Sequence, residues 1–307
     1  MEYNELNKKA MGGTELMANR IEEMLGPDLL SQVQIIHSRV RELDNPKKKI
    51  LVLHDLPGDP EVQHLRNGGW KKFDTLVFVS HWQKQMYETL LGVPPSAGVV
   101  IQNSIEPIEQ HEKPTDKTTL IYYSTPHRGL SLLYPVFDKL YEEYGSAIEL
   151  KVFSSFELYG WPQRDEPYKE LFEALENHPG IQYSKSVSNE TIREELKKAH
   201  IFAYPSIWQE TSCLCLIEAM SAGLTPVHSS LAALPETSMG LSMMYDYVED
   251  PNKHAMTFYN TLRMTIQNIN DPYMRQLTTL RKHSADAIYN TQRQGMRWLA
   301  LANNILL

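Results

Sequence analysis

Cysteine is almost absent from this sequence: among 307 residues only Cys213 and Cys215 carry a thiol, spaced Cys-x-Cys. A disulfide at that spacing on one helix is geometrically poor, and two sulfurs without nearby Cys or His partners do not form a zinc site. We therefore interpret both as small core residues of a protein in a reducing compartment.

Apolar runs are short throughout, and the first residues, MEYNELNKKAMGG, contain no stretch suited to a signal peptide. No run reaches the length needed to cross a membrane, so we expect a cytoplasmic protein without a transmembrane segment. Peripheral contact with a membrane surface stays open.

Positive charge is not in excess. Lys and Arg number 30 against 38 Asp and Glu, for a formal net charge of −8. The electrostatic field of the protein as a whole therefore does not favour binding of nucleic acid, and we expect no nucleic-acid partner.

No Gly-x-Gly-x-x-Gly follows the first expected strand, which argues against a nicotinamide dehydrogenase. No Asp-x-Asp metal motif stands at the end of a strand.

Short β-type runs alternate with helical patterns, which predicts parallel sheets flanked by helices. A polar, proline-bearing stretch without periodicity, residues 105–119, separates two such series, and the chain after Asp250 is wholly helical. The expected strands are 33–38, 49–54, 75–80 and 98–103 before that stretch, and 119–124, 149–155, 181–186, 201–206 and 225–230 after it.

This pattern predicts an α/β protein of two Rossmann-like domains, residues 1–107 and 108–307. Helical patterns follow Thr14 and His81, and Ser80 is the expected N-cap of the second. The terminal helix, around residues 296–307, is apolar enough to pack back onto the first domain. In open α/β sheets ligands bind at the carboxyl ends of the strands, so the cleft between the domains is the expected site.

Residues 209–223, QETSCLCLIEAMSAG, place Glu218 inside an otherwise apolar helix and Glu210 just before it. Thr211 or Ser212 is the expected N-cap, and the free amides at the helix start suit a phosphate. Glu218 would then accept hydrogen bonds from a ribose diol, while Glu210 reaches the group beyond the phosphates. The alternative is a core helix in which Glu218 bonds a neighbouring arginine or backbone amide.

The longer segment YPSIWQETSCLCLIEAMSAGLTPVHSSLAALPE closely resembles the donor-binding signature of the retaining glycosyltransferases of family four, which have the GT-B fold. The two glutamates match the family's pair at the same spacing. The resemblance implies that Glu210 contacts hydroxyls of the donor sugar and Glu218 the nucleotide ribose. It also implies that backbone amides meet the sugar and phosphate at Thr211, Ser212, Cys213 and Leu214.

Two further segments resemble the same family. STPHRGLSLL (124–133) is similar to a loop ending in a basic residue and Gly, which implies that Arg128 clamps the diphosphate. The family's earlier arginine in this loop is absent, because Ser124 and Thr125 stand there. KSVSNETI (185–192) is similar to the segment whose backbone reads the nucleobase, which implies that role for Ser186 and Val187.

The first domain resembles the family less closely. AMGGTELMANRI (10–21) is similar to its glycine-rich loop and helix, which implies that Gly12 and Gly13 lie at the active site. Residues 1–9 supply no strand before this loop, and the domain is short for the fold. LVLHDLPGDP (51–60) places His54 at a strand end, where the family has a histidine beside the reacting sugar; a purely structural histidine is the alternative.

The resemblance implies a retaining glycosyltransferase that uses a nucleotide-diphosphate sugar as co-substrate, with no metal and no cofactor. The acceptor is a saccharide, a lipid or a protein. Two alternatives from other classes remain. One is a catalytically silent module that binds a nucleotide or sugar phosphate, and the other is a GT-B nucleotide-sugar epimerase or hydrolase.

Overall fold

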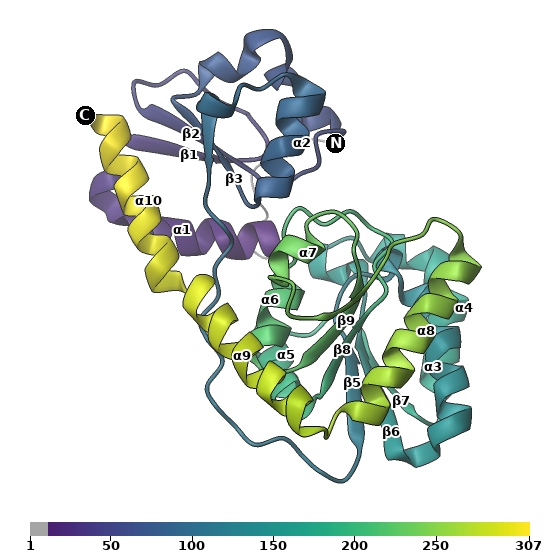
Figure 1. The fold of residues 1–307 in the computed structure, drawn as a ribbon. Coiled ribbons are helices and arrows are strands. Elements are labelled where there is room, and N and C mark those ends of the chain that lie inside the picture. Colours follow the sequence, from purple (N-terminus) through teal and green to yellow (C-terminus); the bar gives the residue numbers. More distant parts are fainter. Residues whose placement is uncertain (1–11) are drawn as a thin grey trace.

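The computed structural model describes residues 12–307 and contains two parallel β-sheets, one in each of two α/β domains (Figure 1). The first sheet has the strand order β1-β2-β3-β4, with β1 Val33–His37, β2 Lys48–Leu53, β3 Thr75–Phe78 and β4 Gly98–Val100. The second has the order β10-β9-β8-β5-β6-β7, with β5 Thr118–Tyr122, β6 Ile148–Phe153, β7 Ile181–Ser184, β8 Ile201–Tyr204, β9 Thr225–Ser229 and β10 Met243–Tyr245.

Burial explains why these segments are strands. Residues 50–53 of β2 and 201–204 of β8 are almost fully buried. Such continuous apolar runs are typical of parallel strands covered by helices on both faces. All nine predicted strands are confirmed, with ends that differ by a few residues. The short strand β10 was not predicted.

Helices cover both faces of the second sheet, with α3 and α8 packed together on one side and α6 and α9 on the other (Figure 1). The helices of this domain are α3 Leu130–Tyr144, α4 Lys169–Asn177, α5 Asn189–Lys198, α6 Leu214–Ser221, α7 Leu234–Thr237, α8 Pro251–Asn268 and α9 Pro272–Ile288. In the first domain, α1 spans Gly13–Leu30 and α2 His81–Leu91. The expected cap of α2 is confirmed, because Ser80 Oγ accepts a hydrogen bond from the Gln83 N–H at 3.0 Å.

The last helix, α10 Thr291–Leu306, returns to the first domain and lies along α1 (Figure 1). Its Trp298 is 1% exposed and belongs to the same core cluster as Ile50, Val52 and Val77. This is the packing that the apolar character of the terminal segment predicts.

The chain therefore passes between the domains twice, once after β4 and once between α9 and α10. Backbone hydrogen bonds join these two connecting segments. The Ile105 N–H donates to the Tyr289 carbonyl at 2.7 Å, and the Thr291 N–H donates to the Ile105 carbonyl at 3.1 Å. The proposed boundary between residues 107 and 108 lies in the segment that connects β4 to β5. Within residues 12–307, no helix combines the length and apolar character that a membrane crossing requires.

Candidate active site

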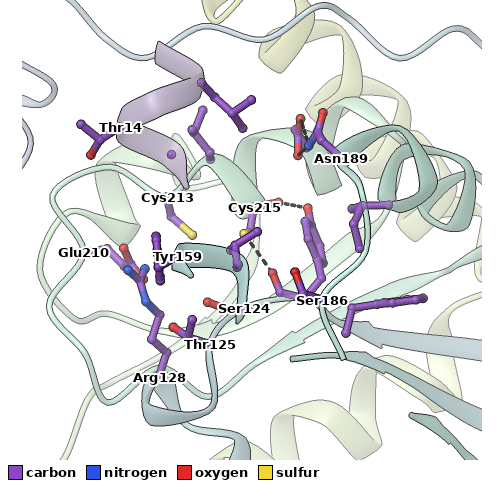
Figure 2. Close-up of a pocket in the computed structure, with 18 of the residues that line it drawn as sticks. Thr14, Ser124, Thr125, Arg128, Tyr159, Ser186, Asn189, Glu210, Cys213 and Cys215 are labelled. Carbon is purple, nitrogen blue, oxygen red and sulfur yellow. Dashed lines mark hydrogen bonds and ion pairs between the residues drawn. The ribbon is translucent and has the colours of Figure 1, made fainter. Parts of the chain in front are cut away.

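A cavity of about 220 Å³ lies where the carboxyl ends of both sheets face each other (Figure 2). Eleven of the twelve predicted site residues line it: Gly13, His54, Arg128, Ser186, Val187, Glu210, Thr211, Ser212, Cys213, Leu214 and Glu218. The twelfth, Gly12, precedes α1 beside the cavity but does not line it. The topology explains this convergence. The turn after β2 opens at the carboxyl edge of the first sheet, and the turns after β5, β7 and β8 open at that of the second.

Arg128 and Glu210 point toward each other across one end of the cavity (Figure 2). Arg128 Nη1 forms an ion pair with Glu210 Oε1, and the same oxygen accepts a hydrogen bond from the Tyr204 hydroxyl at 2.5 Å. Burial alone would lower the pKa of Arg128, but Glu210 and Tyr204 outweigh it and raise that pKa well above its ordinary value. Arg128 therefore stays protonated at this end of the cavity, as the cation of an ion pair.

Glu218 lies at the other end of the cavity and is 4% exposed. Asn189 Nδ2 is 3.3 and 3.4 Å from its two carboxylate oxygens, and Arg193 Nη1 is 3.6 Å from Oε1. Burial raises the pKa of Glu218, while the Asn189 hydrogen bond and the charges of Arg193 and Arg20 oppose that rise. Glu218 thus lines the cavity and has a neighbouring arginine as a partner, and its contact with a ribose stays a prediction.

His54 follows β2 and is fixed by contacts from both domains. Its carbonyl accepts a hydrogen bond from Thr211 Oγ1 at 2.8 Å, and its N–H donates to Ser38 Oγ at 3.2 Å. Its ring Nε2 is 3.3 Å from Nδ1 of His37, which ends β1. Burial, together with His37, lowers the pKa of His54 to about 3, so this ring is neutral near pH 7.

The expected side-chain cap of α6 is wrong. The helix begins at Leu214 with Cys213 as its N-cap, and no side-chain hydrogen bond closes this end. The Thr211 hydroxyl bonds the His54 carbonyl instead, because the first domain approaches at this point. The first-turn amides of α6 therefore have no side-chain partner and remain available at the cavity.

The space around Gly12 is limited by Tyr159, a residue that was not predicted to belong to the site. A Cβ atom at Gly12 would lie 2.4 Å from Cε1 of Tyr159, so the ring of Tyr159 packs directly on this backbone. Tyr159 lines the cavity from the turn after β6, which Asp165 holds through the Ser155 hydroxyl at 2.5 Å and the Phe156 amide at 2.8 Å. Residues 10 and 11 of the glycine-rich segment, and the strandless residues 1–9, lie outside the described part of the chain.

Tyr159 and Asn189 line the cavity and were missed. So were three residues that contact its lining: His37, Arg193 and Tyr204. Only His37 left a usable signal, since it ends the strand beside β2 in the predicted parallel sheet. Both cysteines are free, and both line the cavity. Cys213 belongs to the core of the second domain and Cys215 packs against that core. Within residues 12–307, no group of three His, Cys, Asp or Glu side chains is arranged to hold a metal ion.

Comparison with known proteins agrees with this arrangement. Residues 104–238 match the family model described as glycosyl transferases group 1. No curated protein matches the chain by sequence.

The fold is similar to that of solved glycosyltransferases. A glycosyltransferase from Rickettsia africae ESF-5 has a TM-score of 0.72 at 15% identity, over 100% of this chain and 84% of that one. Sucrose-phosphate synthase from Thermosynechococcus elongatus has a TM-score of 0.66 at 13% identity, over 86% of this chain and 69% of that one. Anabaena HepE, in complex with UDP-glucose, has a TM-score of 0.64 at 12% identity, over 84% of this chain and 72% of that one. The fold is therefore GT-B, as predicted.

Proposed function

We propose that the protein transfers a sugar from a nucleotide-diphosphate donor to an acceptor hydroxyl, with retention of configuration and without a metal ion. One observation carries this proposal. A single cavity between the two GT-B domains holds a fixed cation, an uncapped helix start and two buried carboxylates, and its second-domain side lies largely within the segment that matches the glycosyl transferases group 1 family model.

The donor would lie along the cavity with its nucleoside toward Glu218. The carboxylate of Glu218 would accept hydrogen bonds from the ribose, and the backbone at Ser186 and Val187 would meet the base. The diphosphate would lie at the start of α6, where first-turn amides and the helix dipole favour an anion. The sugar would lie between Glu210 and His54. The UDP-glucose bound to the similar Anabaena protein supports a donor of this class.

Electrostatics would supply most of the catalysis. As the bond between sugar and diphosphate breaks, negative charge develops on the leaving phosphate. Arg128 and the α6 amides would stabilise this charge without reorganising. Glu210 already accepts hydrogen bonds from Arg128 and Tyr204, and these interactions weaken it as a nucleophile. We therefore propose that the acceptor hydroxyl attacks on the face from which the nucleotide leaves, positioned by the two domains.

A silent binding module is the second candidate, and one observation favours it. Ser124 and Thr125 line the cavity where the family resemblance places a further arginine, so a single arginine, already paired with Glu210, would carry the diphosphate charge.

The deciding experiment has two stages. Thermal unfolding is measured with UDP, GDP, ADP and TDP, each with and without EDTA. A nucleotide at a hundred times its Kd stabilises the fold by about 2.7 kcal/mol. In the second stage, the protein is incubated with saccharide acceptors and with nucleotide sugars that carry the nucleotide found to bind. The anomeric configuration of any product is determined by NMR.

Stabilisation that survives EDTA, followed by a product that keeps the donor configuration, supports the proposal. Binding without any turnover supports the silent module. Consumption of the donor without acceptor indicates a hydrolase or epimerase, and the absence of any nucleotide effect overturns the donor assignment.

A further inference from the structure

We propose that His37 is a positioning residue: it holds His54 in the tautomer that carries its proton on Nδ1, so that His54 donates a hydrogen bond into the cavity. The identity of the ligand that receives this bond rests on the proposed function. The arrangement of the two histidines does not, and it can be tested separately.

The two rings meet because β1 and β2 are neighbouring parallel strands. His37 pairs in register with Val52, so both histidines reach the carboxyl edge of the first sheet. Their ring planes are 22° apart, and Nδ1 of His37 is 3.3 Å from Nε2 of His54. The backbone of His54 is already held by Ser38 and Thr211, and His37 is the hydrogen-bond partner of its ring.

Both rings are neutral near pH 7. Burial lowers the pKa of His37 to about 4, and burial with His37 lowers that of His54 to about 3. Between two neutral imidazoles, one nitrogen of the bonded pair carries the proton and the other accepts. Two arrangements are therefore open, and they give His54 opposite tautomers.

The remaining nitrogen of His37 decides between them. His37 Nε2 is buried and has no hydrogen-bond partner in the described part of the chain. If His37 accepted at Nδ1, its proton would sit on this Nε2 as a buried, unpaired N–H. Unpaired buried N–H groups are rarer in proteins than under-satisfied acceptors. His37 therefore carries its proton on Nδ1 and donates to His54.

The consequence appears at the cavity. Because Nε2 of His54 accepts from His37, its own proton lies on Nδ1. No residue between 12 and 307 bonds this Nδ1, and His54 lines the cavity. His54 thus presents an N–H donor that does not titrate near neutral pH. Its matching ligand atom is an oxygen acceptor, such as a hydroxyl or ring oxygen of the donor sugar.

The first test needs no substrate. In protein labelled with ¹⁵N-histidine, two-bond ¹H–¹⁵N correlation spectra distinguish neutral Nδ1–H from Nε2–H rings. The signals are assigned by their loss in His37→Asn and His54→Asn. We expect both rings as Nδ1–H at pH 7. A His54 ring in the Nε2–H form overturns the proposal, whether or not the protein transfers sugar.

The second test uses the near-isosteric variants His37→Asp and His37→Asn, with folding checked by thermal unfolding and with UDP-glucose as the probe. A carboxylate at residue 37 only accepts, so it draws the proton of neutral His54 to Nε2. It also raises the pKa of His54, and at lower pH the doubly protonated ring regains Nδ1–H.

The measured quantity is the ratio of the affinity for UDP-glucose to the affinity for UDP. In His37→Asp this ratio should fall at least tenfold as the pH rises from 5 to 8. In wild type and His37→Asn it should not change with pH. A ratio that rises with pH in His37→Asp shows the opposite tautomer, and a flat ratio shows a merely structural His37; either outcome overturns the proposal. If none of UDP, GDP, ADP and TDP binds wild type, the proposed function fails and the NMR result still stands.

Discussion

Glu236 of the second domain caps the N-terminus of helix α2 in the first domain. Its Oε1 accepts a hydrogen bond from the His81 N–H and its Oε2 from the Trp82 N–H, both at 2.9 Å. A carboxylate at a helix start satisfies free amides and complements the helix dipole. Here the two partners belong to different domains, so this cap also sets how closely the domains approach.

Replacing Glu236 by Ala should loosen the closed arrangement. Losing such a cap costs about 0.5–2 kcal/mol, and Ser80 still caps the same helix, so each domain should stay folded. We expect small-angle scattering to show a larger radius of gyration and trypsin to cleave faster in the connecting segment at Lys117. The control is Glu249→Ala, which removes an exposed carboxylate. Equal behaviour of the two variants would refute this role for Glu236.

Substituting Gly12 by Ala should disturb the cavity through Tyr159. The new methyl would lie 2.4 Å from the ring and 2.5 Å from Glu15 Oε2, so the ring must move. We expect weaker nucleotide-sugar binding with little loss of stability, measured by calorimetry and thermal unfolding. Gly58→Ala is the matched control, because a Cβ there meets nothing within 4 Å. Unchanged binding in Gly12→Ala would show that Tyr159 does not contribute.

Removing the charge of Arg128 should separate diphosphate binding from nucleoside binding. We expect Arg128→Ala to lower the affinity for UDP by at least tenfold and that for uridine by less than threefold, because only the diphosphate meets the guanidinium. The variant also leaves Glu210 buried without its cation, so its melting temperature should fall. Glu210→Gln, in contrast, should abolish transfer and keep UDP binding. Equal losses for UDP and uridine in Arg128→Ala would remove this residue from the phosphate site.

Nucleoside affinity should depend on pH through Glu218. Its pKa is raised by burial. In the proposed function, the carboxylate rather than the acid would accept hydrogen bonds from both ribose hydroxyls. Uridine binding should therefore weaken as pH falls through this raised pKa, and uridine carries no phosphate that titrates there. Glu218→Gln should bind more weakly at every pH and show no such dependence. A wild-type affinity that is flat from pH 4.5 to 8 would contradict the ribose assignment.

Folding stability should decline below pH 6.5. His37, His54 and His228 have pKa values lowered by burial to about 4, about 3 and about 4, from 6.5 in the unfolded chain. Their contribution to the free energy of unfolding is complete above pH 6.5 and is lost as pH falls toward 4. Over this range the unfolded chain binds protons at these histidines and the folded chain does not. Each histidine contributes a slope of up to about 1.4 kcal/mol per pH unit.

Urea unfolding of wild type and His228→Gln, from pH 4.5 to 7, measures this slope. The variant retains two of the three histidines, so its dependence on pH should be shallower by one histidine's contribution. A slope that does not change would show that His228 is protonated in the folded protein.

The strands could be predicted because buried parallel strands are continuous apolar runs, and residues 50–53 and 201–204 are of this kind. The strand β10 was missed because its residues, Met243–Tyr245, include no β-branched side chain, unlike the equally short edge strand β4. Glu210 and Glu218 were recognised from their spacing within one segment. His37 and Tyr159 were missed because their importance arises from contacts with His54 and Gly12, which depend on strand order and domain approach rather than local sequence.

The same reasoning explains the wrong cap of α6. Local sequence favours Thr211 as an N-cap, but its hydroxyl is directed toward the first domain, where it donates to the His54 carbonyl. A contact between domains outweighed a local preference, and it left the helix start open at the cavity.

The return of α10 to the first domain has a consequence for biosynthesis. Ile50, Val52 and Val77 form one face of the first sheet, and Trp298 of α10 packs against this cluster. A ribosome makes those strands long before α10, and domains commonly fold as they emerge. Here the second domain can complete its own core first, while α1 covers only part of the apolar face of the earlier domain and the rest stays uncovered until α10 is made. The part of the protein that is synthesised first is therefore the part that finishes folding last.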